Sequence, residues 1–144
     1  MIGATASVKR TRHKALPALH GHTKVKVGYP AGVVKGGIIM RAIWNHYGTK
    51  NIPSRPWLYI AMRKNAAKYR RLFEKFGAKV LDGTLTLENA LRLLGEIAKA
   101  DVQRSLIALR TPPNAPRTLR AKKPRTNPLI WTGEMNQATT YQTF

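Results

Sequence analysis

The sequence predicts an α+β domain in which a small antiparallel sheet packs against two or three helices. Three observations support this fold class: an alternating segment near the start, two long stretches with apolar residues at steps of three and four, and strand-like composition at the end. We expect residues 1–22 to form a basic flexible N-terminal arm. Residues 23–144 are expected to form one domain that includes an arm rich in Pro, Arg and Lys at 110–128.

The outer elements are short. The segment TKVKVGYP alternates polar and apolar residues over 24–27, which is typical of a half-buried strand, and a glycine-punctuated connection or hairpin follows it. Residues 38–48 predict a short helix closed by Gly48. At the other end Thr132 is placed to cap a helical turn, and TTYQTF has the composition of a strand.

The clearest predicted element is one long helix after Pro56, a residue suited to a first helical turn. One side carries an apolar stripe that we expect to face the core: Leu58, Met62, Ala66, Tyr69, Phe73, Phe76 and Val80. The opposite side is basic: Lys64, Lys68, Arg71, Lys75 and Lys79. Such a stripe is either a solvated surface or a face turned towards phosphate or an acidic neighbour.

A second helix is predicted after a turn at Asp82 and Gly83, with Thr86 as its N-cap. Its apolar positions are Leu87, Leu91, Leu94, Ala98, Val102, Leu106 and Leu109, widened by Leu93 and Ile97. The proline-rich residues 110–128 that follow predict an extended or loop arm on the surface, because each proline removes a backbone donor from a helix or a central strand.

Charge is the strongest feature of the composition. Lys and Arg number 26 against six acidic residues, the formal net charge is +20, and no acidic residue precedes Glu74. Such a chain is expected to lie against phosphates or acidic protein surfaces, without reading a base sequence. The predicted contacts with DNA or an acidic partner are Lys9, Arg10, Arg12, Lys14, Lys64, Lys68, Arg71, Arg117, Arg120, Lys122, Lys123 and Arg125.

Signals for catalysis are weak. The chain has no cysteine, its six carboxylates are scattered, and His20 and His22 have no carboxylate nearby to complete a metal site. No apolar run is long enough for a membrane span, and the N-terminus lacks the apolar region of a secretion signal. We therefore expect a protein that is not an enzyme, needs no cofactor or metal, and does not enter a membrane.

Three segments together resemble the neck and tail-completion proteins of long-tailed bacteriophages, a group akin to the minor tail protein Z of phage lambda. They are VGYP, IWNHYGTKNIPSRPWL and PPNAPRTLRAKKPRTNPLIWTGEMNQATTY, and the similarity spans roughly residues 24–141. The matching positions are Asn45, Tyr47, Gly48, Thr49, Ile52, Pro53, Arg55, Pro56, Trp57, Leu58, then Pro112 to Pro116, then Pro128, Leu129, Ile130, Thr132 and Gly133. Two departures are His46, where the family has an acidic residue, and Trp131, where it has Asp.

The resemblance implies a structural virion protein, a homo-oligomeric ring that is commonly a hexamer and joins the tail to the head–portal connector around the DNA channel. Implied partners are head-closure or connector proteins, tail-tube or tail-terminator proteins, and genomic DNA through non-specific contact. Assembly would take place in the bacterial cytoplasm. The side of the junction on which the ring lies stays open.

The residues that the resemblance assigns to assembly are Arg55, Pro56, Trp57, Pro112, Pro113, Asn114, Pro116, Trp131, Thr132 and Gly133. Arg55 is expected to hold neighbouring backbone or carboxylate groups with its planar fork of donors and to matter more for assembly than for folding; the alternative is a solvated turn residue. The alternative function is a non-enzymatic nucleic-acid-binding protein of the ribosomal or nucleoid type that uses a basic surface.

Overall fold

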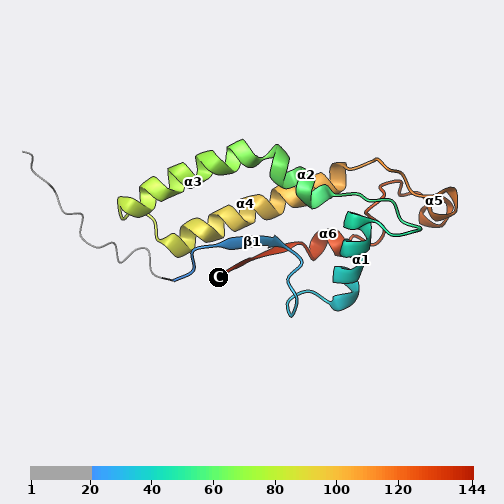
Figure 1. The fold of residues 1–144 in the computed structure, drawn as a ribbon, viewed down its shortest axis with the longest axis horizontal. Helices are drawn as coiled ribbons and strands as arrows, with labels where there is room; N and C mark the ends of the chain where they lie inside the picture. Colours follow the sequence, from blue (N-terminus) through green and yellow to red (C-terminus); the bar gives the residue numbers. More distant parts are fainter. Residues whose placement is uncertain (1–20) are drawn as a thin grey trace, which may run out of the picture.

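The computed structural model describes residues 21–144. The predicted contacts Lys9, Arg10, Arg12 and Lys14, and nearly all of the predicted N-terminal arm, lie outside the described residues. Within residues 21–144 the chain forms six helices and one two-stranded antiparallel sheet (Figure 1). The predicted α+β fold class is confirmed.

The sheet joins the two ends of the described chain. Strand β1 (Val25–Gly28) pairs with β2 (Thr140–Thr143), so that Val25 lies opposite Thr143 and Gly28 opposite Thr140. Both strands were predicted, and β1 ends at Gly28, two residues before Pro30. The sheet therefore fixes the C-terminal segment beside the start of the domain.

The long helix α4 (Leu87–Ala108) organises the rest of the fold. In Figure 1 it runs along the molecule with α2 (Trp57–Lys64) and α3 (Ala66–Leu81) on one side and the sheet on the other. Thr86 is its N-cap as predicted, and its side-chain oxygen accepts from the Asn89 N–H at 3.2 Å. The helix packs on both sides, and its buried residues are Ala90, Leu91, Leu94, Gly95, Ala98, Val102 and Leu106, together with the charged Asp101.

The prediction of one continuous helix after Pro56 is wrong, because the chain leaves helical geometry at Asn65, with φ −101° and ψ 8°. The Asn65 side-chain amide donates to the carbonyl of Ala61 at 2.8 Å, a local bond by which asparagine competes with helix continuation. The break turns α3 relative to α2 and changes which residues meet the core. Phe73, predicted to be in the core, is 57% exposed, whereas Val80 is buried.

The prediction for residues 110–128 also needs correction, because this segment contains the helix α5 (Pro116–Lys122). Pro116 stands in its first turn, where the missing N–H has no helical partner to lose. Two further helices complete the fold: α1 (Gly36–Tyr47), which ends at Gly48 as predicted, and α6 (Glu134–Gln137). Thr132 accepts from the Glu134 N–H at 3.3 Å at the start of α6.

The contact between α4 and β2 is tight at Gly95. A Cβ atom there would lie 2.3 Å from the Tyr141 ring, whereas a Cβ at Gly77 in α3 would meet nothing within 4 Å. We expect Gly95→Ala to lower the free energy of unfolding by about 1 to 3 kcal/mol through overpacking. Gly77→Ala, the matched control, is expected to raise it by about 0.5 to 1 kcal/mol, because alanine favours helix over glycine. Urea denaturation measures the free energy of unfolding of both variants. If Gly95→Ala stabilised the protein as much as Gly77→Ala, Tyr141 would not pack on α4.

Candidate functional site

The centre of the candidate site is Arg55, whose side chain is 2% exposed. It makes four hydrogen bonds: Nε to the Pro112 carbonyl at 2.8 Å, Nη1 to Asn45 Oδ1 at 3.2 Å, Nη2 to the Pro113 carbonyl at 2.9 Å, and Nη2 to Asn114 Oδ1 at 3.2 Å. The guanidinium thus joins the end of α1 to the proline-rich segment. This is the backbone-holding role predicted for Arg55, and the alternative of a solvated turn residue is wrong.

The loop after α1 presents Arg55 to these acceptors. Gly48 has φ 85°, and a Cβ there would come within 2.9 Å of the Ser54 nitrogen, so the close turn requires glycine. The Arg55 N–H donates to the Asn45 carbonyl at 2.8 Å, and the Ser54 hydroxyl donates to the His46 carbonyl at 2.8 Å. Arg55 is therefore held by its own backbone as well as by its side chain.

A second buried cation lies on the same side of the molecule. Lys122, at the end of α5, is 4% exposed and donates to the carbonyls of Asn127 at 2.7 Å and Pro128 at 3.4 Å. The prediction of Lys122 as a contact on an exposed basic surface is wrong, because packing of α5 carries this side chain inwards. Neither Lys122 nor Arg55 hydrogen-bonds to an acidic side chain within residues 21–144.

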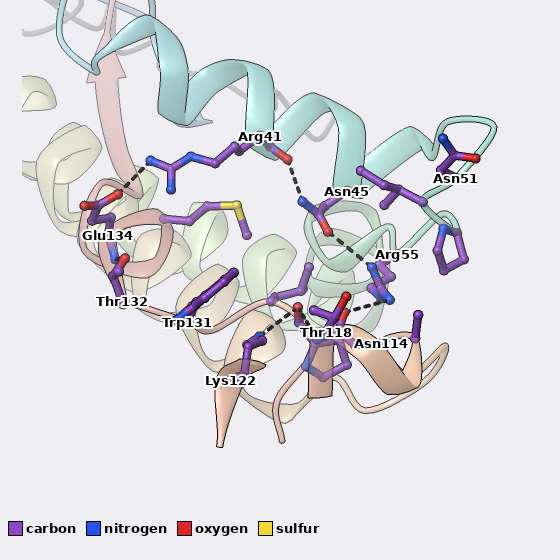
Figure 2. A pocket seen from close by; sticks show the side chains of 17 residues that line it. Arg41, Asn45, Asn51, Arg55, Asn114, Thr118, Lys122, Trp131, Thr132 and Glu134 are labelled. Carbon is purple, nitrogen blue, oxygen red and sulfur yellow. Dashed lines mark hydrogen bonds and ion pairs between the residues drawn. The ribbon is translucent and has the colours of Figure 1, made fainter. Parts of the chain in front are cut away.

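Arg55 and Lys122 line one cavity of about 330 Å³ (Figure 2). Asn51, Thr118 and Trp131 also line it, and at its edge Arg41 pairs with Glu134 at 2.6 Å. Burial lowers the pKa of Arg55. Burial, and then the positive charge of Arg55, lower the pKa of Lys122. The cavity is therefore a recess of mixed polar and apolar lining with two buried cationic donors.

The structure places the predicted assembly residues in several surroundings, which include the cavity, the acceptors of Arg55 and the core. Pro112, Pro113 and Asn114 accept from Arg55, while Trp131, Thr132 and Gly133 line the cavity on the α6 side. Pro56 and Trp57 lie elsewhere: Trp57 is 1% exposed, and its ring packs edge-on against Tyr29 and His46. Pro116 begins α5 and is exposed.

The remaining predicted basic contacts are mostly on the surface. Those with exposed side chains are Lys64, Arg71, Arg117, Arg120, Lys123 and Arg125. Lys68 differs, because its ammonium binds the buried carboxylate of Asp101 at 2.7 Å together with Arg104 at 2.7 Å. The Tyr69 hydroxyl also donates to Asp101, and burial followed by this carboxylate raises the pKa of Tyr69.

Two apolar surfaces of the described chain have no covering element. The first, which we call the α1 surface, consists of Met40, Ile43, Trp44 and Tyr47, all exposed and spaced so that they share one helix face. The second, the α3–α4 groove, has a volume of about 320 Å³ and is lined by apolar residues including Phe73, Leu81 and Leu87. The α1 surface was missed from the sequence, although the apolar periodicity of residues 38–47 was its signal.

Comparisons with protein-family models, curated proteins and solved structures found no match to this chain. Among residues 21–144 no helix has the length and apolarity needed to cross a bilayer. The same residues hold no cluster of three or more His, Asp or Glu side chains that suits a metal ion.

Proposed function

We propose that this chain is a ring-forming neck or tail-completion subunit of a long-tailed phage, which joins the tail to the head–portal connector around the DNA channel. The observation that carries the proposal is the pair of uncovered apolar surfaces. The α3–α4 groove includes Leu81 and Leu87, which flank the turn at one end of the long axis, while α1 lies towards the other end (Figure 1). The motif resemblance supplies the biological setting.

Apolar surfaces in opposite halves of a subunit suit head-to-tail association. When each copy places one end on the other end of its neighbour, both surfaces are buried in the same contact, and the contact closes into a ring if the rotation allows it. Monomeric proteins rarely leave extended apolar patches uncovered. The two surfaces therefore favour assembly over an isolated monomer.

The distribution of charge supports the same contact. Residues 110–125, around α5, carry six cationic side chains and no acidic one, whereas the acidic residues Asp82 and Glu88 flank the α3–α4 turn at the other end. Asp82 and Glu88 offset the nearby Lys79 and Arg92, so the α3–α4 end repels the basic α5 end less than a second α5 end would, which favours a head-to-tail encounter.

Mixing of complementary variants tests the proposal. We expect the wild-type chain to form oligomers in sedimentation velocity in about 0.3 M salt, which screens the repulsion between copies of charge +20. Trp44→Ser with Tyr47→Ser disables one end, and Phe73→Ser with Leu81→Ser disables the other. Each double variant is expected to be monomeric, and an equal mixture of the two to form heterodimers through the one intact contact.

Tyr59→Ser is the matched control, because Tyr59 is 57% exposed and lies on neither apolar surface. It is expected to assemble like the wild type. A wild-type chain that stays monomeric at every concentration would refute the ring. Loss of assembly with only one of the two double variants would indicate a symmetric dimer instead.

The exposed cations around α5 favour the second candidate, a nucleic-acid-binding protein. That function predicts tight binding of duplex DNA by the monomer, with an affinity that falls steeply as salt rises. Fluorescence anisotropy with a labelled duplex, using the two monomeric double variants, separates the candidates. Tight binding by those monomers would favour the nucleic-acid-binding protein, and weak binding recovered only on assembly would favour the ring.

A further inference from the structure

The Arg55–Lys122 cavity has an unusual balance of charge. Buried charges in proteins are normally paired with an opposite charge, because desolvation of an isolated ion is costly. Here two cations, 2% and 4% exposed, share one cavity and are held only by carbonyl and amide oxygens. The acidic side chain on the lining, Glu134, is paired with Arg41.

Both cations keep donor capacity. A guanidinium has five N–H groups, and the four bonds of Arg55 leave one N–H on Nη1 without an acceptor in the described chain. An ammonium has three, and the two bonds of Lys122 leave one. Two charged donors on the lining of one recess favour an anionic oxygen ligand such as a carboxylate.

We propose that the Arg55–Lys122 cavity is a binding site for a carboxylate group. A carboxylate on a small molecule or on an Asp or Glu side chain is narrow enough to enter a recess of about 330 Å³. The phosphates of duplex DNA lie on a broad convex rod, which suits exposed cations better than donors that are almost wholly buried. Asn51 and Thr118, on the same lining, supply neutral polar groups.

The carboxylate has two possible sources with the same chemistry, a free carboxylic acid or an acidic side chain of a neighbouring copy. Asp82 at the α3–α4 turn is the candidate tested for the second source, because it is exposed, forms no ion pair in the described chain and lies at the opposite end from α5 (Figure 1). Only this source rests on the proposed ring, and the site itself does not.

Acetate is the probe. We expect acetate, added against chloride at constant ionic strength to the double variant Phe73→Ser with Leu81→Ser, to shift the indole N–H signal of Trp131 in a 1H–15N spectrum, saturating in the millimolar range. This variant keeps Trp44 and the cavity but lacks one side of the proposed contact, so release of a neighbour does not move the Trp44 signal. The indole signal of Trp44, which is exposed but does not line the cavity, is the internal control and is expected to stay fixed. Equal drift of both signals would overturn the proposal. Saturation by inorganic phosphate at far lower concentration would overturn the assignment to carboxylate.

Variants tie the signal to the cations. Lys122→Met is expected to weaken acetate binding at least tenfold, whereas Lys123→Met removes a neighbouring exposed cation and is expected to leave it unchanged. Equal affinities in these two variants would overturn the proposal. If Lys122→Met does not fold, the comparison of Trp131 with Trp44 in the Phe73→Ser, Leu81→Ser variant, where Lys122 is intact, still decides.

Asp82→Asn distinguishes the two sources. If a neighbour fills the cavity, acetate competes with wild-type oligomers, and Asp82→Asn weakens assembly while leaving acetate binding by the monomer intact. If a free acid fills the cavity, acetate binds, and neither added acetate nor Asp82→Asn alters assembly. Both results support the carboxylate site. Neither depends on the ring, which the double variants test independently.

Discussion

Replacing Arg55 by leucine is expected to lower the free energy of unfolding by about 3 to 5 kcal/mol, because several buried oxygens then lose a charged donor. The guanidinium donates to two carbonyls and two side-chain amide oxygens, and leucine donates to none of them. Arg55→Lys is expected to cost less than leucine but still to destabilise, because an ammonium cannot reproduce the planar fork. Urea denaturation followed by circular dichroism gives the free energies of unfolding of the wild type, Arg55→Leu and Arg55→Lys.

Arg41→Leu is the control for this experiment. Arg41 also joins distant parts of the chain, through its ion pair with Glu134, but both side chains are about half exposed. An exposed pair contributes at most about 1 kcal/mol, so Arg41→Leu is expected to have little effect. If Arg55→Leu proved as stable as Arg41→Leu, the guanidinium would not be what holds residues 112–114 against α1.

Local patterns were sufficient to predict much of the fold. The alternation at 24–27, the glycine at 48 and the threonine at 86 each act within one element, and the structure confirms all three. The pairing of β1 with β2 follows from the prediction of two short strands in one domain, because each strand has only the other as a partner in the described sheet. Elements whose boundaries are set by residues close in the sequence can therefore be predicted from a single sequence.

The errors arose where a side chain acts on distant or competing partners. Asn65 interrupts an apolar periodicity that continues on both sides of it, so the stripe through Phe73 suggested one helix and the wrong core face. Lys122 was read as a surface cation because its acceptors come from the fold of residues 127–128. Lone cations are usually exposed, and only the tertiary structure shows one that is buried.

The candidate site was predicted in part. The motif around Arg55 and the segment at 112–114 were assigned together from their resemblance to one family, and the structure joins them by hydrogen bonds. The cavity itself was not foreseen, because it is formed by α5, α6 and the loop after α1, which approach only in the folded chain. Trp57 was assigned to assembly because it lies in the same motif as Arg55, yet it belongs to the core.

Replacing Trp57 by alanine is expected to lower the free energy of unfolding by about 3 to 5 kcal/mol, the usual cost of removing a fully buried aromatic side chain. Trp57 is the largest fully buried side chain in the described residues, and it shares one core cluster with Leu106, Leu129 and Met135. Its loss therefore opens a cavity where α2, α4 and the C-terminal segment meet. Thermal and urea unfolding measure the effect.

Trp44→Ala separates a role in the core from a role in assembly. Trp44 is 44% exposed on α1, so its replacement is expected to change the free energy of unfolding by less than about 1 kcal/mol while weakening association. Trp57→Ala is expected to lower the free energy of unfolding and to leave association unchanged, when assembly is measured below the unfolding temperature of the variant. If Trp57→Ala kept the wild-type stability but abolished assembly, the motif around residue 57 would serve the interface as first predicted, and its burial within one subunit would be mistaken.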